Sequence, residues 1–364
     1  MERGIKVDFK AAIRETRGAD GEALAKAREY CDSLIKPFGS LGRLEDIAVR
    51  LSGITGLVNN SFDKRVVVVM AADNGVYAEG VAAAPQAFTL LQAVNMTRGI
   101  CGVSVFSKAA GADLVVVDIG VMNPTGSDAV LDRNVKRGTD NMAVGPAMTR
   151  EEAEAAIGVG FDVASDLFGQ GYEILGTGEM GIANTTSTSA CAIVLLGLDP
   201  EFAVGRGAGL TDETLANKVS VVKRAIAVNS PDADDPIDVV SKVGGLDIAG
   251  LVGCFLAAAY HRKPVLIDGA ISAVAALIAA RLCPPAKDFM IATHRSTEPS
   301  YDAAIKELGL RPFLEMEMRL GEGSGCALAL PIVLGACTMM NDMGTFADIS
   351  FDDSVLVDIR DTDK

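Results

Sequence analysis

Five runs of consecutive apolar residues, rich in β-branched side chains, recur along the chain, and each ends in a polar or glycine-rich turn. Segments of helical length separate them. A strand that is apolar at every position, instead of alternately apolar and polar, is typical of a parallel sheet covered by helices on both faces. The pattern therefore predicts an α/β fold with a parallel sheet whose strands lie within residues 65–73, 113–121, 172–181, 264–270 and 288–296.

Helix signals occupy the intervening segments. Thr149 and Glu152 have the spacing of a capping box, and apolar residues follow at helical spacing over 150–168. A second helix is expected over 211–227, because the acidic pair Asp212-Glu213 at its beginning suits a helix N-terminus.

The two ends of the chain have helical patterns. Apolar residues recur at helical spacing in the first 60 residues and again over 326–345. No internal repeat, low-complexity tract or long linker divides the chain between them. We therefore expect a large α/β domain over 61–325 and a small helical subdomain formed by 1–60 together with 326–364.

Composition and charge narrow the classes of function. The 364 residues are 49% hydrophobic and 22% charged, which is typical of a globular protein. The formal net charge is −15, and an acidic surface repels a phosphate backbone unless it carries a local basic stripe. We find no such stripe and predict no nucleic-acid partner. A small anionic substrate is compatible with this charge, because helix N-termini and single lysines bind anions locally.

The cysteines and the first residues of the chain indicate a reduced, cytoplasmic protein. Seven cysteines are scattered without a Cys-x-x-Cys pair, and the first ten residues contain no apolar signal segment. The most apolar tracts are interrupted by Asp268, Arg281 and Pro331, so we predict no membrane partner. The two histidines are far apart and no metal-ligand spacing occurs, so we predict no metal site.

The densest polar segment is Gly176–Ser189, where glycines and hydroxyl residues follow an apolar strand and precede an alanine-rich stretch. Glycines allow a ligand to approach the backbone closely, and hydroxyl groups at a helix start add donors to free N–H groups. The segment indicates an anion cradle at the carboxyl edge of the sheet. A capped strand-to-helix turn without a ligand is the alternative.

Three further glycine-rich segments are candidates for a functional site. In Arg319–Gly325, glycines flank Glu322 and leave its carboxylate open to a ligand, where partial desolvation would raise its pKa toward that of a useful base. Gly205–Gly209 precedes Lys218, which could oppose a phosphate. The alternatives are an exposed loop glutamate and a solvated helix lysine. The segment 244–253 has no preceding strand, so we expect a core helix and not a dinucleotide loop.

Nine segments in the same order along the chain resemble the nicotinate-nucleotide–dimethylbenzimidazole phosphoribosyltransferase family. They span nearly the whole chain and include Ala72-DNGVYAEGVAAAPQ, Gly178-EMGIANTT, Thr293-HRSTEP and Arg319-LGEGSG. The resemblance implies a Rossmann-like large domain, a small domain built from both termini, and usually a homodimer. It also implies transfer of the 5-phosphoribosyl group of nicotinate mononucleotide to an aromatic base, classically 5,6-dimethylbenzimidazole, with release of nicotinate and inversion to the α-ribotide.

The resemblance further implies roles for individual residues. The acceptor must lose a proton as it attacks, and Glu322 matches the general base, with Glu179 as the second catalytic acid. The pyridinium of the donor is already an activated leaving group, so no metal or organic cofactor is implied. The nucleotide-binding residues that match are Gly181, Asn184, Thr185, Gly209, Lys218 and Ser296. Those near the acceptor are Asn74, Gln86 and Leu320.

The acceptor side departs from the family pattern. Asn74 stands where the family commonly has histidine, and alanines occupy 82–84. We therefore hypothesise, as an alternative, the same chemistry on a phenolic or purine acceptor. A second alternative is a partner subunit that forms a heterodimer with an active paralogue, which the presence of both Glu179 and Glu322 disfavours. A nicotinamide-dinucleotide oxidoreductase is disfavoured because residues 70–73 lack the glycine fingerprint.

Overall fold

The sheet in the computed structural model is parallel throughout. The structure describes residues 8–207 and 209–361, and within them six strands pair in the order β3-β2-β1-β4-β5-β6. Each of the five predicted runs contains one strand, whereas β3 is too short to leave a sequence pattern. The strands are β1 (Arg65–Ala72), β2 (Asp113–Gly120), β3 (Leu131–Asp132), β4 (Ile174–Met180), β5 (Val265–Ile267) and β6 (Met290–Ala292).

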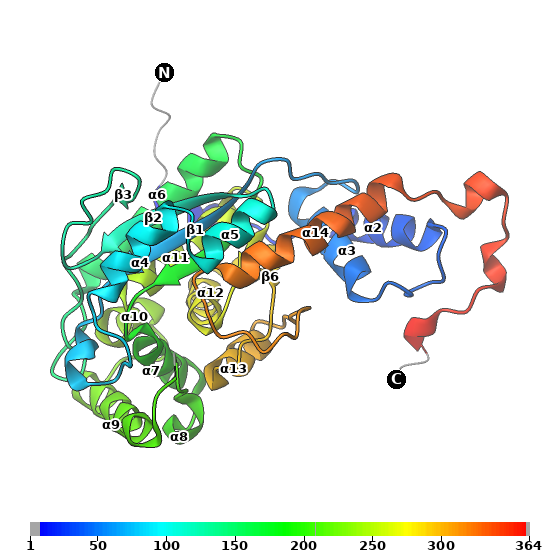
Figure 1. The fold of residues 1–364 in the computed structure, drawn as a ribbon. Helices are drawn as coiled ribbons and strands as arrows, with labels where there is room; N and C mark the ends of the chain where they lie inside the picture. Colours follow the sequence, from blue (N-terminus) through cyan, green and yellow to red (C-terminus); the bar gives the residue numbers. More distant parts are fainter. Residues whose placement is uncertain (1–7, 208, 362–364) are drawn as a thin grey trace.

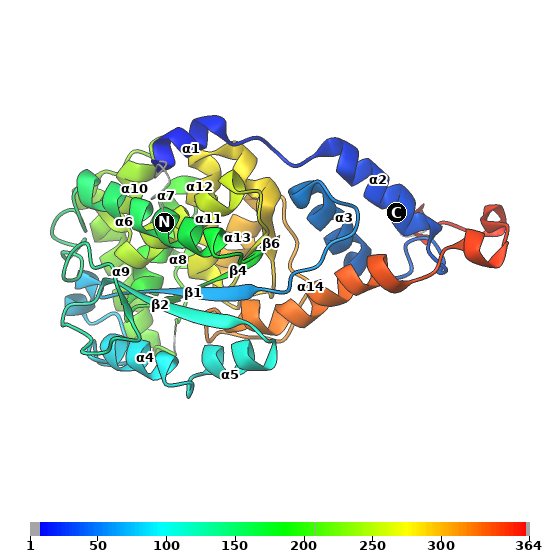
Figure 2. The same ribbon diagram turned by 90° about the horizontal axis from the view of Figure 1, so that it is seen from above.

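Helices cover both faces of this sheet, which confirms the predicted α/β architecture (Figures 1 and 2). In β1, Val67 and Val69 face a core shared with α4 and α5, whereas Val66 and Val68 face a larger core with α6 and α11. Successive strand residues point to opposite faces, so both sets must be apolar. The helices are α1 (Phe9–Glu15), α2 (Gly21–Ser33), α3 (Arg43–Thr55), α4 (Phe88–Thr97), α5 (Gly102–Ala109), α6 (Arg150–Gly169), α7 (Asn184–Leu196), α8 (Pro200–Ala203), α9 (Asp212–Asn229), α10 (Pro236–Val243), α11 (Leu246–Tyr260), α12 (Ala270–Leu282), α13 (Pro299–Glu307) and α14 (Ser324–Asp342), with short 3-10 helices at Gly75–Glu79, Pro284–Phe289, Phe346–Ile349, Asp353–Val355 and Ile359–Asp361.

The glycine-rich segment 244–253 leads into and forms the first half of α11, which is buried along its length. Its glycines permit close contact with α6. A Cβ at Gly160 would lie 1.8 Å from the Gly250 carbonyl oxygen, and a Cβ at Gly253 would lie 2.0 Å from that of Ile157. The expectation of a core helix, and not a dinucleotide loop, is therefore confirmed.

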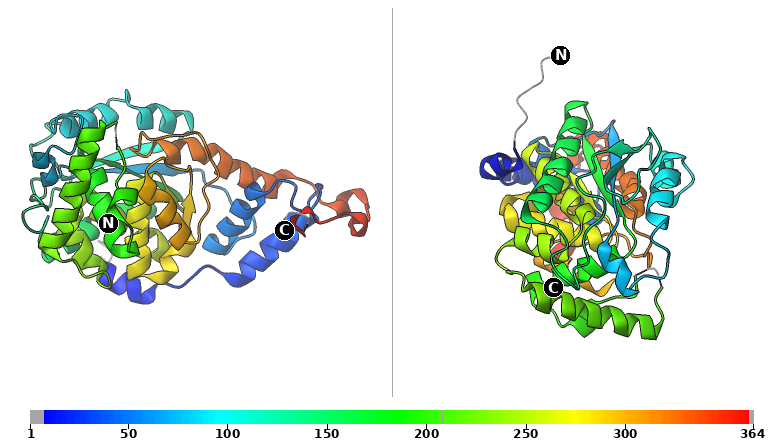
Figure 3. Two further views of the ribbon diagram at one scale, coloured as in Figure 1. Left: turned by 90° about the horizontal axis from the view of Figure 1, so that it is seen from below. Right: turned by 90° about the vertical axis from the view of Figure 1, so that its left-hand side faces the viewer.

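Helices α2 and α3 and the second half of α14 lie together at one end of the molecule, where the C-terminal segment folds back (Figures 1 and 3). The guanidinium of Arg360 donates to both carboxylate oxygens of Asp32 in α2, at 3.1 and 3.0 Å. Helix α1, in contrast, packs against α11 and α6 beside the sheet. The division into 61–325 and a subdomain of the two chain ends stays a prediction.

Helix α14 joins this end of the molecule to the sheet. Among the helices in the described part of the chain, it is the one long and apolar enough to cross a membrane by length and composition, but 61% of its apolar window is buried inside the protein. It packs against α3, α5 and β4. These contacts are those of a core helix.

Candidate active site

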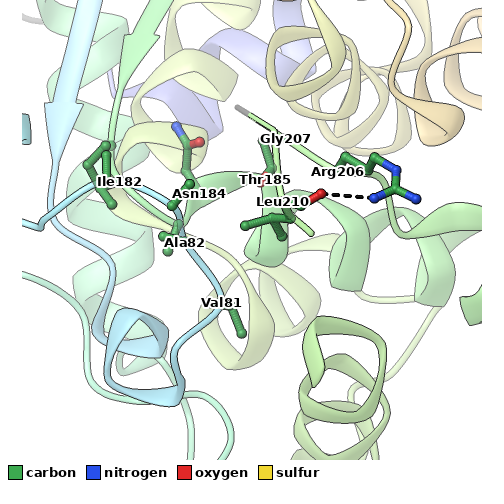
Figure 4. Close-up of a pocket in the computed structure, with 12 residues that line it drawn as sticks. Val81, Ala82, Ile182, Asn184, Thr185, Arg206, Gly207 and Leu210 are labelled. Carbon is green, nitrogen blue, oxygen red and sulfur yellow. Dashed lines mark hydrogen bonds between the residues drawn. The ribbon is translucent and has the colours of Figure 1, made fainter. Parts of the chain in front are cut away.

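The carboxyl ends of β1 and β4 lie side by side where the strand order reverses, with β2 beyond β1 and β5 beyond β4. In open α/β sheets this point leaves a crevice for ligands. A cavity of about 240 Å³ lies there, and its walls come from the ends of β4, β5 and β6, the start of α7 and the loop before α14. A smaller cavity of about 90 Å³ adjoins it (Figure 4). The residues that line both cavities are Ala84, Gly181, Ile182, Asn184, Thr185 and Gly207.

Glu322 lies in the loop before α14, and its backbone is left-handed. The φ angles of Gly321, Glu322 and Gly323 are 76°, 63° and 89°, values that residues with a Cβ rarely adopt. The loop also packs closely on β4, because a Cβ at Gly178 would lie 2.5 Å from the Glu322 carbonyl oxygen. The flanking glycines thus serve the backbone conformation, in addition to leaving the carboxylate uncrowded.

Asp268, which follows β5, holds this loop in place. Its carboxylate accepts hydrogen bonds from the backbone N–H groups of Gly323, at 2.9 Å, and Gly325, at 2.7 Å. Helix α14 has no capping bond from its own N-cap residue, so Asp268 satisfies these groups from a distant strand. The buried Asp268 therefore positions Glu322.

Glu322 lines the main cavity, and one oxygen of its buried carboxylate has no hydrogen-bond partner. Glu322 is 7% exposed, so the alternative of an exposed loop glutamate is wrong. Its Oε1 accepts from Gln92 Nε2 at 2.7 Å, whereas the buried Oε2 has no hydrogen-bond partner. Burial raises the pKa of Glu322 above its ordinary value, and the Gln92 hydrogen bond acts in the opposite direction. A buried acceptor without a donor is what a proton-accepting site requires.

A second buried carboxylate, Glu179, lies at the end of β4. Asn184 Nδ2 donates to Glu179 Oε2 and also to Asp247 Oδ2, at 2.9 Å for the latter. The Glu322 backbone N–H donates to Glu179 Oε1 at 3.3 Å. Burial raises the pKa of Glu179 to about 8 and that of Asp247 to about 6, and Asp247 adds to the effect on Glu179. The two acids thus share one amide donor in a site that disfavours charge on both.

Glu179 should make the stability of the protein fall as pH rises. Its pKa is raised from 4.5, so between about pH 4.5 and about 8 the folded protein holds a proton that the unfolded chain has lost. Relative to wild type, Glu179→Gln should gain about 1–3 kcal/mol in free energy of unfolding between those pH values. Denaturant unfolding at a series of pH values measures this, with the exposed Glu213→Gln as control. Parallel curves for wild type and Glu179→Gln would contradict it.

The start of α7 forms the other end of the cavity. No side chain caps this helix, but the N–H groups of Asn184 and Thr186 already donate to the carbonyls of Gly181 and Ala183, at 3.1 and 2.9 Å. In the first turn the N–H of Thr185 is the one left to donate to an anion among the described residues. Lys218 of α9 is completely buried, and its Nζ donates to Thr185 Oγ1 at 2.8 Å and to the Gly205 carbonyl at 3.0 Å. Burial lowers the pKa of Lys218 to about 8. The alternative of a solvated helix lysine is therefore wrong.

The structure brings most of the sequence-predicted site residues together. Those that line the main cavity are Glu179, Gly181, Asn184, Thr185, Ser296, Leu320 and Glu322. Lys218 lies behind Thr185. Gly209 and Gln86 are not among the residues that line the two cavities. Asn74 is completely buried beneath the site, where it accepts a hydrogen bond from Ser187 Oγ at 3.1 Å.

Four residues that the sequence did not assign to the site contribute to it. Gln92 binds Glu322, Asp247 shares Asn184 with Glu179, Asp268 caps the Glu322 loop, and Glu298 accepts from Gly207. Asp268 had a signal in the sequence, since it follows a predicted strand. The other three lie on helices or at a helix start, where nothing local distinguishes them from solvated polar residues.

One group of side chains in the described residues has the spacing of metal ligands, namely Cys31, Asp32 and Glu45. None of them lines the two cavities. Lys36 Nζ lies 2.9 Å from Glu45 Oε1, and Arg360 donates to both oxygens of Asp32. The charges of the two carboxylates are thus already balanced within the protein, and we assign no metal to this group.

Comparisons with known proteins agree on one family. Residues 16–350 match the family described as Phosphoribosyltransferase. The nicotinate-nucleotide–dimethylbenzimidazole phosphoribosyltransferase of Clostridium tetani is 49% identical over 354 residues, which cover 97% of this chain and 98% of that protein. The enzyme of the same name from Acetivibrio thermocellus is 51% identical over 327 residues, or 90% and 93% of the two chains. The crystal structure of the corresponding Thermus thermophilus protein has a TM-score of 0.87 and 38% identity and covers 92% of this chain and 99% of that one.

Proposed function

The chain belongs to the nicotinate-nucleotide–dimethylbenzimidazole phosphoribosyltransferase family, and on that basis we propose that it transfers the 5-phosphoribosyl group of nicotinate mononucleotide to an aromatic base. The products are nicotinate and the α-ribotide of a cobamide lower ligand. The observation that carries the proposal is one cavity with an uncapped helix N-terminus at one end and a buried, unpaired carboxylate oxygen at the other.

Glu322 is the general base in this proposal. The acceptor attacks C1′ as the bond to the pyridinium breaks, and a proton leaves the acceptor nitrogen or oxygen. The unpaired Oε2 of Glu322 takes that proton, while Gln92 holds Oε1. Glu179, already protonated near neutral pH by its burial, supports the loop through its contact with the Glu322 N–H. No metal or organic cofactor takes part.

The donor phosphate binds at the start of α7. Thr185 and Ser296 present hydroxyl groups to the cavity, Lys218 supplies a positive charge from behind Thr185, and Gly181 and Asn184 belong to the same turn. Gly209, with a φ of 110° that favours glycine, lies two residues after Gly207, which lines the cavity. The hydroxyl, amide and ammonium donors are those that phosphate prefers.

The acceptor binds nearer to Glu322, between Leu320 and the segment that contains Ala84, Gln86 and Phe88. Ala84, Phe88 and Leu320 line the cavity and give this end an apolar surface suited to an aromatic ring. Asn74, where the family commonly has histidine, does not line the cavity and affects the acceptor only through the buried residues that it contacts, such as Ser187. The acceptor is 5,6-dimethylbenzimidazole, with a phenol or purine as the alternative that these departures favour.

Incubation with nicotinate mononucleotide and a panel of benzimidazoles, purines and phenols tests the proposal, with free nicotinate as the measured product. We expect base-dependent release of nicotinate by this chain alone. High kcat/KM for 5,6-dimethylbenzimidazole, without turnover of phenol or adenine, would eliminate the alternative acceptors. No release with any base, restored by adding a paralogous chain, would show instead a partner subunit of a heterodimer and overturn the proposal.

We further propose a cytoplasmic homodimer without a nucleic-acid or membrane partner. Large apolar side chains are exposed on α4, in the turn between α4 and α5, and in the loop before α14, and two of them, Phe88 and Leu320, line the main cavity. Phe88 is 38% exposed, Leu91 50%, Ile100 62% and Leu320 54%. Exposed apolar residues grouped in this way favour a protein interface. The acidic net charge of −15 agrees with the absence of a nucleic-acid partner.

A further inference from the structure

Glu298 lies across the anion-binding end of the cavity. Its Oε1 accepts a hydrogen bond from the Gly207 backbone N–H at 2.8 Å, and its own N–H donates to Ser296 Oγ at 3.3 Å. Its Oε2 lies so close to the neighbouring loop that a Cβ at Gly205 would be 2.1 Å away. Glu298 therefore contacts the groups that line the place proposed for the phosphate.

The position of Glu298 at the start of α13 does not account for these contacts. It is the N-cap residue of α13, but its side chain makes no capping hydrogen bond to that helix. Its carboxylate instead reaches a loop that is 91 residues away in sequence. The side chain is partly exposed and lines the cavity, so a ligand can reach it.

The negative charge of Glu298 acts on Lys218 at this end of the cavity. Lys218 is bonded to neutral oxygens of Thr185 and Gly205, and Glu298 is the acid that supports its positive charge. Of the arginines around the cavity, Arg206 pairs with Asp212 and Arg295 with Asp302, whereas Arg319 lines the cavity from the loop before α14. A phosphate placed beside Ser296 and Thr185 would stand next to the Glu298 carboxylate, and two anions at such a distance repel strongly.

We propose that Glu298 is an internal competitor for the donor phosphate, which holds the Gly207 N–H in the free enzyme and is displaced when the phosphate of the nucleotide binds. The carboxylate mimics a phosphate oxygen on that N–H. Displacement opposes the binding of every phosphate, and only a ligand with further contacts to the cavity offsets it. Glu298 therefore keeps free inorganic phosphate, which has few other contacts, from occupying the site, whereas the further contacts of the nucleotide offset the same penalty. This inference rests on the proposed function only in taking nicotinate mononucleotide as the ligand that carries the phosphate.

Titration calorimetry with inorganic phosphate tests the competition without any turnover. Glu298→Gln keeps an oxygen that accepts from the Gly207 N–H but removes the charge. We expect the Kd for phosphate to fall about tenfold, because one repulsive charge next to the anion is lost. Glu317→Gln is the matched control, since Glu317 is an exposed acid on the loop facing Arg295 but does not line the main cavity. Its Kd should stay within about twofold of wild type.

An unchanged or higher Kd in Glu298→Gln would overturn the inference, because Glu298 would then only order the loop. An equal fall in the phosphate Kd of Glu317→Gln would also overturn it, since the effect would then come from the net charge of the protein and not from the position of Glu298. With nicotinate mononucleotide, Glu298→Gln should lower KM several-fold and leave kcat within about threefold, a split that loss of loop order would not produce. If wild type releases no nicotinate but Glu298→Gln still binds phosphate more tightly, the proposed function fails and the competition stands.

Discussion

Replacing Glu322 with glutamine should lower kcat by at least about a hundredfold, the usual contribution of a positioned general base. Glutamine is nearly isosteric and can still accept the hydrogen bond from Gln92, but it cannot take a proton. The left-handed backbone and the contacts of Gly321 and Gly323 are unchanged, so the loop should keep its conformation. The measurement is steady-state release of nicotinate at saturating donor and acceptor.

The outcome for Glu322→Gln needs two controls. Glu315→Gln removes an exposed acid a few residues earlier and should leave kcat within about twofold, because its charge is screened by solvent. Thermal unfolding of Glu322→Gln should show a stability equal to or above that of wild type, since a buried carboxylate with a raised pKa is replaced by a neutral amide. A kcat within about threefold of wild type would show that the carboxylate does not take the proton.

Replacing Lys218 with methionine should raise KM for nicotinate mononucleotide by about 10- to 100-fold, because the positive charge behind Thr185 and the hydrogen bond that orients the Thr185 hydroxyl are both lost. Methionine fills a similar volume in the completely buried site but gives Thr185 no donor and the phosphate no positive charge. The value of kcat should change less, because Lys218 lies at the donor end and not beside Glu322. Lys223→Met, on the exposed face of the same helix, is the control.

The stability of Lys218→Met should depend on pH differently from that of wild type. The pKa of Lys218 is lowered from 10.5 to about 8, so between these values the unfolded chain holds a proton that the folded protein has lost. The stability of wild type should therefore rise, relative to Lys218→Met, as pH increases from about 8 to about 10.5. An unaltered KM together with parallel stability curves would contradict the proposed phosphate contact.

The local sequence was sufficient for five of the six strands, β3 being the exception, and for the turn at the start of α7. The β-branched runs are apolar at every position because both faces of the sheet are covered, and that requirement is visible in a few consecutive residues. Segment 176–189 combined a strand end, glycines and hydroxyl residues, and the structure has β4 and the uncapped start of α7 there. The residue-by-residue roles at this site stay predictions.

The acceptor end was less predictable. Gln86, which precedes α4, was selected from the sequence, but in the structure Gln92 on α4 is the residue bonded to Glu322. The local sequence does not tell which of the two glutamines reaches the Glu322 loop, because that loop is far away along the chain. Asn74 likewise follows β1 at the expected edge of the sheet, yet its side chain is buried and accepts a hydrogen bond from Ser187 instead of lining the cavity.

The sequence by itself determined the fold class, the family and the carboxyl edge at which the site would lie, because these depend on apolar runs and on the order of short motifs along the chain. The tertiary structure alone decided which charged groups act on one another. Glu322 meets Gln92 across 230 residues, its loop is held by Asp268 from β5, and Glu298 reaches Gly207 across 91. Burial and charge at such contacts depend on how distant segments pack, and that is not encoded in any one of them.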